Sequence, residues 1–183
     1  MKEQQKKYEL TDEFIEHWSG RKLYRIRALV AFGAVVAGQL GGFVESDKNL
    51  DQSLSSNAWV YGGAQVYGDA RVYGDAQVYG NAQVYGDALV YGNALVYGDA
   101  LVRSYAVIYE RKMIFLATNV GSENGTLTVF NGENGLIVTR GCFVGTVDEF
   151  LAKSAEVHDD KTKNEYKLLI EVARSRILGV KDE

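Results

Sequence analysis

Few residues of this chain could perform acid–base, nucleophilic or metal chemistry. The 183 residues include two histidines, His17 and His158, and one cysteine, Cys142. A histidine can act as a general base near neutral pH, whereas a zinc site needs three or four ligands. His17 lies in a short N-terminal segment and His158 in the sequence His-Asp-Asp-Lys, so we interpret both as solvated polar residues. We therefore predict no catalytic residue, no metal ligand and no cofactor.

Cys142 and the regularly spaced aspartates also favour structural roles. Cys142 stands in Gly-Cys-Phe ahead of an expected helix, a setting that can activate a thiol, but it has no partner adjacent in sequence. Aspartate and asparagine interchange at equivalent positions, as turn residues do and catalytic acids do not. These positions are Asp69, Asp75, Asn81, Asp87, Asn93 and Asp99. No glycine-rich loop opens a helix in the manner of a phosphate-binding loop.

The aspartates belong to a repeat of six residues. The chain reads Val-Tyr-Gly-(Asp/Asn/Gly)-Ala-x, and its aliphatic position recurs at Val60, Val66, Val72, Val78, Val84, Val90, Val96, Val102 and Ile108. Alanine keeps the same register at Ala58, Ala64, Ala70, Ala76, Ala82, Ala88, Ala94, Ala100 and Ala106. A period of six fits neither a coiled coil nor a long helix, and the Tyr-Gly pairs oppose helix formation.

Each hexad therefore predicts a short strand and a corner. Valine and alanine can fill a narrow prism, tyrosine faces outward, and glycine with Asp or Asn accepts the left-handed backbone of the corner. Three hexads complete one triangular coil, and successive coils stack at a spacing of roughly 4.8 Å. Residues 18 positions apart in the sequence should consequently form ladders along the prism.

The repeat resembles that of the hexapeptide-repeat proteins, which fold as a left-handed parallel β-helix and include acyltransferases and γ-class carbonic anhydrases. The left-handed turn is implied by this resemblance alone, because ordinary parallel crossovers are right-handed. The resemblance also implies a homotrimer. The enzymes of the family use a histidine base or three zinc-bound histidines, and the repeat of this chain contains no histidine.

Four further segments resemble uncharacterised hexapeptide-repeat proteins of phages and prophages. They are Tyr8-Glu-Leu-Thr-Asp-Glu, Arg21-Lys-Leu-Tyr-Arg-Ile-Arg-Ala-Leu, Gly41-Gly-Phe-Val-Glu-Ser and Asn57-Ala-Trp-Val-Tyr-Gly. This resemblance covers most of the chain, and it implies a phage or prophage origin without an established activity.

The β-helix is expected to extend upstream of the regular repeat. Ala28 and Ala34 keep the six-residue spacing, and counting on by sixes reaches Ala58 without a slip. We therefore predict an N-terminal cap segment over residues 1-27 and a β-helix over 28-111. Within the β-helix, the irregular first coils occupy 28-57 and the regular hexads 58-111.

Residues 112-183 predict a small β-β-β-α-α domain. Alternation of apolar and polar residues indicates three strands, over 113–118, 126–130 and 136–140, joined by hairpin turns. Two capping boxes, Thr146-Val-Asp-Glu149 and Thr162-Lys-Asn-Glu165, each open an amphipathic helix. The second helix carries a stripe at helical spacing: Tyr166, Leu169, Ile170, Ala173 and Ile177. The predicted fold class is mainly β, a left-handed parallel β-helix followed by a small α+β domain.

Composition restricts the partners and the compartment. A formal net charge of −4 provides no basic field, so binding to duplex nucleic acid is not expected. The polar start of the chain lacks the apolar stretch of a secretory signal, and the apolar segment 28–44 is interrupted by glycines. We expect a cytoplasmic protein in a bacterial host, with no membrane anchor.

Two surface features predict self-association as a homotrimer. Tyrosines should stack in three ladders: Tyr61, Tyr79 and Tyr97; Tyr67 and Tyr85; and Tyr73, Tyr91 and Tyr109. The last hexad position becomes apolar toward the C-terminal end of the repeat, at Leu89, Leu95, Leu101 and Val107. We assign Tyr61, Tyr79, Tyr97 and this apolar collar to the oligomer interface, although the C-terminal domain could also cover the collar. The ladders could instead stack bases or other rings.

A candidate ligand site lies where the β-helix meets the C-terminal domain. Four basic side chains fall near this junction and suit a phosphate or carboxylate: Arg103, Arg111, Lys112 and Arg140. A turn and one strand add polar groups: Ser122, Glu123, Asn124, Thr126 and Thr128. The residues alone leave open whether this cluster binds a ligand or is merely solvated.

The function expected from these observations is binding rather than catalysis. The first hypothesis is a non-catalytic trimeric protein of phage or prophage type that inhibits or sequesters a host defence component or a small anionic, nucleotide-like signal. The alternatives are an acyltransferase-like enzyme whose base is His158, and a purely structural phage protein.

Overall fold

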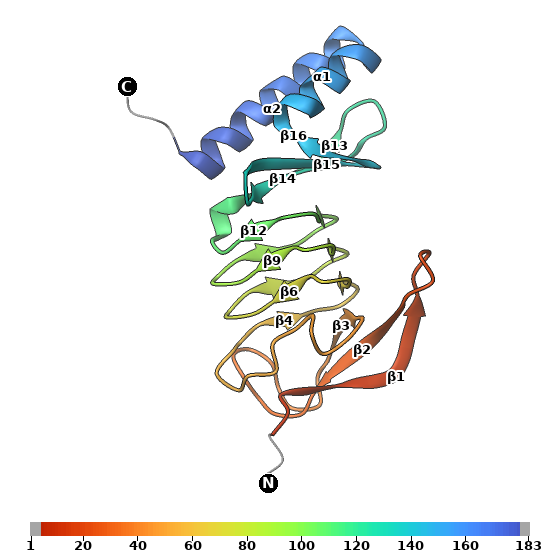
Figure 1. Ribbon diagram of the computed structural model, residues 1–183, viewed down its shortest axis with the longest axis vertical. Helices are drawn as coiled ribbons and strands as arrows, with labels where there is room; N and C mark the ends of the chain where they lie inside the picture. The colour runs from red at the N-terminus through yellow and green to blue at the C-terminus, as the bar shows by residue number, and fades with distance from the viewer. Residues whose placement is uncertain (1–4, 180–183) are drawn as a thin grey trace.

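The chain forms a column of four parts (Figure 1). We describe residues 5–179 of a computed structural model. From the N-terminus upward in the view, a β-hairpin leads into a β-helix of about four turns, a four-stranded sheet covers the last coil, and two helices cover the sheet. Mainly β structure with a small C-terminal domain is therefore confirmed. Within residues 5–179, no helix is long and apolar enough to cross a membrane.

The regular hexads form nine two-residue strands arranged on three faces. One face contains β4 (Trp59–Val60), β7 (Gln77–Val78) and β10 (Leu95–Val96). The second contains β5 (Gln65–Val66), β8 (Gln83–Val84) and β11 (Leu101–Val102), and the third β6 (Arg71–Val72), β9 (Leu89–Val90) and β12 (Val107–Ile108). Strands on each face are parallel and pair residues 18 apart, such as Val60 with Val78, as predicted.

The repeat valines and alanines are buried inside the prism. Val78 and Ala82, for example, have no exposed surface, and the repeat residues form one continuous apolar cluster. The corners require glycine, as Gly74 illustrates. Its φ is +68°, and an added Cβ would lie 3.0 Å from the amide nitrogen of Gly92 in the coil above. A residue with a side chain would therefore be strained at this corner, both by the left-handed backbone and by the short distance to the next coil.

The N-terminal segment is a hairpin that extends one face of the β-helix. β1 (Tyr8–Glu16) pairs antiparallel with β2 (Lys22–Ala28), which pairs with β3 (Leu40–Val44). β3 then pairs parallel with β5, giving the order β1-β2-β3-β5-β8-β11. The predicted cap over residues 1–27 is thus largely this hairpin, which we call the arm; residues 1–4 lie outside the described range.

The uninterrupted six-residue count through the first coil was wrong. Phe43 pairs with Gln65, and Leu50 bridges to Val72, so each pair is separated by 22 residues instead of 18. The additional residues lie in polar turns between residues 45 and 57, where the side chains of Asn49 and Asp51 accept hydrogen bonds from backbone amides nearby. Such local bonds stabilise turns that a strict hexad could not accommodate.

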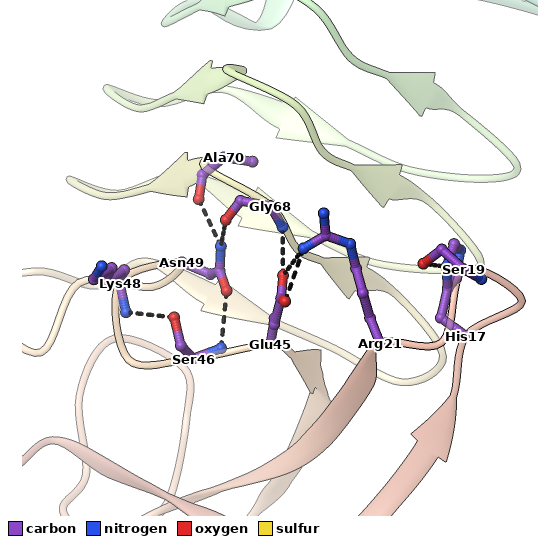
Figure 2. A network of polar contacts seen from close by, with 9 residues as sticks. All are labelled: His17, Ser19, Arg21, Glu45, Ser46, Lys48, Asn49, Gly68 and Ala70. Carbon is purple, nitrogen blue, oxygen red and sulfur yellow. Dashed lines mark hydrogen bonds and ion pairs between the residues drawn. The ribbon is translucent and has the colours of Figure 1, made fainter.

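Below the first regular coil, side chains provide the hydrogen bonds that a further coil would otherwise make (Figure 2). Asn49 Nδ2 donates to the carbonyls of Gly68 and Ala70 over 3.0 and 2.9 Å, and the amide of Gly68 donates to Glu45 Oε2 over 2.8 Å. At another corner, the buried Nζ of Lys7 donates to the carbonyl of Ala58 over 3.1 Å. Backbone groups that would otherwise pair with a lower coil are satisfied by these side chains.

A four-stranded antiparallel sheet covers the upper end of the β-helix. It contains β13 (Ile114–Val120), β14 (Gly125–Gly132), β15 (Gly135–Arg140) and β16 (Phe143–Thr146), preceded by the short 3-10 helix η1 (Arg111–Met113). The alternation predicted three strands, and β16 is the addition. Ile114 and Phe130 join the apolar cluster of the β-helix. The Thr139 hydroxyl donates to the carbonyl of Leu101 over 2.6 Å, which satisfies part of the last coil.

Two helices pack on the opposite face of this sheet. α1 (Val147–Val157) begins with the predicted capping box: the amide of Glu149 donates to Thr146 Oγ1, and the amide of Thr146 donates to Glu149 Oε2. α2 (Asp160–Leu178) starts earlier than predicted, because the Asp159 side chain accepts from the amide of Thr162 and caps the helix. The buried stripe of α2 is confirmed at Tyr166, Ile170, Ala173 and Ile177.

Candidate functional site

A cleft in the C-terminal domain gathers the chemically most varied side chains. Its volume is about 450 Å³, and it opens between the β13–β14 turn, the β15–β16 turn, the C-terminal end of α1 and the start of α2. Of the predicted ligand cluster, Ser122, Glu123 and Arg140 line this cleft. Residues from two turns and two helices therefore line the same cleft.

Arg140 is a largely buried cation with little charge compensation. Its side chain is 12% exposed. Nε donates to the hydroxyl of Tyr166 over 3.1 Å, and another guanidinium nitrogen donates to the carbonyl of Val120 over 3.3 Å. Among residues 5–179, the nearest carboxylate is that of Glu123, which lies 4.0 Å away and is 83% exposed. Neutral groups thus hold the guanidinium in place, and the part of the chain that the structure describes provides no close buried counter-ion for its charge.

Two glycines provide the space that this arrangement occupies. A Cβ on Gly125 would lie 2.5 Å from a guanidinium nitrogen of Arg140, and a Cβ on Gly121 would collide with the hydroxyl of Tyr166. Gly121 also has a φ of +72°, which side chains rarely adopt. The β13–β14 turn therefore depends on glycine for its path and for the seating of Arg140 against Tyr166.

Aromatic and basic groups complete the wall of the cleft. The rings of Phe143 and Phe150 lie 5.3 Å apart, and Phe150 contacts Tyr166 at 5.0 Å, both in edge-on geometry. His158 stands 5.4 Å from the Tyr166 ring, and its Nδ1 lies 3.1 Å from Ser154 Oγ. Lys153 and the exposed thiol of Cys142 also line the cleft. This combination suits a ligand that joins an anionic group to an apolar or planar body.

The other residues of the predicted ligand cluster lie elsewhere. Thr128 is buried, and its hydroxyl accepts from the amide of Leu101, so it joins the sheet to the last coil. Arg103 lies over the ring of Tyr85 at 5.1 Å. Arg111 and Lys112 belong to η1, where Lys112 pairs with Glu110 at 3.6 Å.

Asn124 and Thr126 flank Gly125 but do not line the cleft. Asn124 occupies the turn with a φ of +50°, and Thr126 follows on β14. The predicted single cluster is therefore not formed, because the sheet places β14, η1 and the β13–β14 turn at different positions above the last coil.

Sequence reasoning missed most of the wall of this cleft. Phe143 and Tyr166 are separated by more than twenty residues, and only the packing of α2 on the sheet brings them together. One signal was available: Phe150, Ser154 and His158 recur every four residues and so share a face of α1 and its C-cap. That spacing associates His158 with the apolar side of α1, although its polar neighbours in the sequence predict a solvated residue.

The predicted tyrosine ladders are present in most positions. Tyr67 stacks on Tyr85 at 4.9 Å, and Tyr79 on Tyr97 at 5.7 Å. On the third face the pairs Tyr73–Tyr91 and Tyr91–Tyr109 stack at 4.8 and 5.4 Å. Tyr61 instead packs against the main apolar cluster. The collar residues Leu89, Leu95, Leu101 and Val107 are half-buried in the single chain.

The arm contributes to one of these ladders. The His17 imidazole lies 4.7 Å from the Tyr67 ring, on the same ladder as Tyr85 and Arg103. Burial and the neighbouring Tyr85 raise the pKa of Tyr67 to about 12, an effect that Arg103 and Arg21 partly oppose. The ladder thus begins at the tip of the arm and ends at an arginine.

The histidines and acidic residues assemble no metal centre within residues 5–179. No group of three or more His, Cys, Asp or Glu side chains there is placed to hold a metal ion. His17 and His158 belong to different ends of the column, the arm and the C-terminal cleft respectively.

Comparison with known proteins concerns the repeat. Residues 64–80, 76–88 and 82–98 match a family model described as YdcK Beta solenoid repeat. No curated protein matches the chain. The chain is similar to this repeat family over part of the β-helix, which agrees with the repeating fold predicted from the hexads.

Proposed function

We propose that this protein is a non-catalytic binding protein whose C-terminal cleft binds a small ligand with an anionic group attached to a planar ring, of the nucleoside monophosphate type. The observation that carries the proposal is the state of Arg140. Its guanidinium is nearly buried and held by Tyr166 and Val120, yet the closest carboxylate within residues 5–179 is an exposed side chain 4.0 Å away. An anion in the cleft would compensate this charge.

The remainder of the cleft supports a ligand with an apolar portion. Phe143 and Phe150 provide aromatic surface close to the guanidinium, and Lys153 provides a second positive charge. The β-helix below supports the sheet that carries the cleft. Lys7 and Asn49 bond to backbone groups at its lower end, and the sheet covers its upper end and bonds to part of the last coil, so both ends are covered and less available for stacking into a fibre. This arrangement favours binding over a spacer role.

The biological setting that we propose follows from the sequence resemblances. A phage or prophage protein that binds a nucleotide-like anion in the bacterial cytoplasm is suited to sequester a signal of host defence, or to inhibit a defence protein that uses one. A homotrimer would present three such clefts. Light scattering that gives three times the chain mass of 20.2 kDa, or a multiple of that mass, supports the trimer, and a mass of one or two chains contradicts it.

An acyltransferase-like enzyme with His158 as its base is the alternative. The observation that favours it is that His158 lines the same cleft as Cys142 and Arg140. The two functions make opposite predictions for His158→Ala. Acyl transfer by the wild type that His158→Ala loses while it still binds AMP supports the enzyme. A wild type without acyl transfer, with AMP binding retained in His158→Ala, supports the binding protein.

The reactivity of Cys142 provides a direct test of binding. It is the only cysteine of the chain and lines the cleft, so the rate of alkylation by iodoacetamide reports whether the cleft is occupied. We expect AMP to slow alkylation in a saturable manner and inorganic phosphate to do so only weakly. Arg140→Met should weaken the protection by about tenfold or more, the loss of one charge-assisted contact.

Two controls isolate the role of Arg140. Arg111→Met removes an exposed arginine outside the cleft and should leave protection by AMP unchanged. Lys153→Met removes a positive charge that makes no buried contact, so it tests the cleft even if Arg140→Met fails to fold. Alkylation rates that AMP leaves unchanged both in the wild-type protein and in Trp18→Ala, whose cleft residues are all retained, would overturn the proposal.

A further inference from the structure

The tip of the arm exposes a tryptophan to solvent. Trp18 is 90% exposed, the largest exposed fraction among the large apolar side chains of the described residues. It stands in a tight turn in which the amide of His17 donates to the carbonyl of Arg21, and the amide of Gly20 to the carbonyl of His17, both over 2.8 Å. Ser19 Oγ lies 2.7 Å from His17 Nδ1. The backbone of the turn is therefore well defined.

The β-helix braces this turn from two sides. The His17 ring rests on Tyr67, which is buried. Arg21 donates to both carboxylate oxygens of Glu45 over 2.8 and 2.9 Å, and Glu45 in turn accepts from the amide of Gly68 (Figure 2). The arm thus presents Trp18 from a fixed backbone position, so little backbone conformational entropy remains to be lost when the indole is buried by a partner.

The chemistry of the tip matches that of the C-terminal cleft. An exposed tryptophan on a fixed backbone is typical of an interface anchor. Glu16, two residues before it, is exposed and forms no ion pair within residues 5–179. The cleft offers the complement: aromatic surface on Phe143 and the under-compensated charge of Arg140. Arginine also packs favourably on the face of an indole.

The positions of tip and cleft allow two copies to exchange these contacts. In Figure 1 the tip of the arm and the β13–β14 turn at the cleft project toward the same side of the column, at different heights along it. Two columns placed side by side in opposite directions therefore bring each tip to the cleft of the other. Such a pair has twofold symmetry and closes on itself.

We infer that two copies of this chain pair in this way, the Trp18 tip of each occupying the C-terminal cleft of the other. The inference rests on the proposed function, because it names a second occupant for the same binding site. Pairing and ligand binding are then mutually exclusive. Ligand binding therefore separates the two copies. When the ligand is absent, the Trp18 tips occupy both clefts of the pair.

The mass of the protein in solution tests the pairing. We expect wild-type protein to have twice the mass of Trp18→Ala by light scattering, whether the variant itself is a single chain or a trimer. Phe14→Ala removes another exposed aromatic ring of the same arm, 42% exposed, and should retain the wild-type mass. Addition of AMP should halve the mass of the wild type and leave Trp18→Ala unchanged.

A cross-link locates the contact. Ser19→Cys places a second thiol beside Trp18, and mild oxidation should join it to Cys142 of the other copy in a disulfide. Ser19→Cys combined with Cys142→Ser should lose this product. Asn93→Cys, at an exposed corner of the β-helix, should form no disulfide with Cys142.

The outcomes separate this inference from the proposed function. A Trp18→Ala variant with the wild-type mass, or a Ser19→Cys cross-link that persists without Cys142, overturns the pairing. Protection of Cys142 by AMP in Trp18→Ala still measures ligand binding on its own. If that protection is absent while Trp18→Ala has half the wild-type mass, the pairing stands and the nucleotide-binding role falls.

Discussion

The imidazole of His17 lies 4.7 Å from the ring of Tyr67, so a residue of the N-terminal arm forms a rung of a ladder that otherwise belongs to the β-helix. Tyr85 and Arg103 continue this ladder toward the C-terminal domain. The arm is therefore part of the packed structure, and its orientation depends on a contact between segments fifty residues apart.

Loss of this contact should release the tip of the arm. We expect His17→Ala to destabilise the protein by about 1 kcal/mol, the usual size of an aromatic pair. Amide exchange over residues 17–21 should accelerate at least several-fold, because the turn loses its brace. His158→Ala is the matched control and should leave exchange in the tip unchanged. Equal exchange in the wild type and His17→Ala would show that Arg21 and Glu45 alone hold the turn.

Lys7 should make stability depend on pH in the alkaline range. Burial lowers its pKa from 10.5 to about 8 in the folded protein, although Asp51 opposes the shift. Between these values the unfolded chain binds more protons than the folded one, so stability rises with pH, by up to about 3 kcal/mol if Lys7 acts alone. Above pH 10 the raised pKa of Tyr67 reverses the trend, because unfolding then releases a proton.

The control for this prediction is Lys7→Met, which keeps an apolar chain of similar length without a charge. Its stability in urea should not rise between pH 8 and pH 10. A rise in Lys7→Met as large as that of the wild type would assign the effect to other groups. The measurement is the midpoint of urea unfolding at several pH values.

A charge inside the prism should be severely destabilising. Val78 has no exposed surface and is surrounded by the valines and alanines of adjacent coils. Val78→Asp should cost several kcal/mol, since no water or partner can reach the carboxylate there. Asn93→Asp, at an exposed corner where the repeat already exchanges these two residues, should change stability by less than about 0.5 kcal/mol. Thermal unfolding of both variants checks the inward register.

The capping box of α1 should contribute a smaller, measurable amount. Thr146→Ala removes the acceptor for the amide of Glu149, at a cost of about 1 kcal/mol. Because α1 carries Phe150, Ser154 and Lys153 into the cleft, we also expect weaker protection of Cys142 by AMP. Thr118→Ala, on an exposed position of β13, is the control. An unchanged melting temperature in Thr146→Ala would indicate that packing alone sets the start of α1.

The repeat by itself determined the regular part of this fold. Each hexad between Ala58 and Ile108 meets a neighbour of the same composition 18 residues away, so the local pattern contains its own packing partner. The inward valines, the glycine corners and most of the tyrosine stacks followed from that periodicity. The capping box at Thr146 and the buried stripe of α2 were likewise local, because a helix turn lies within four residues.

Tertiary structure alone decided the two ends and the cleft. The spacing of 22 residues between Phe43 and Gln65, and the bond from Lys7 to Ala58, arise where the periodic neighbour is missing and distant segments must satisfy the exposed backbone. Arg140 and Tyr166 meet only because α2 packs across the sheet, and no spacing in the sequence encodes that approach. Contacts within a repeat are specified by its period, whereas contacts between unlike elements depend on how their surfaces pack.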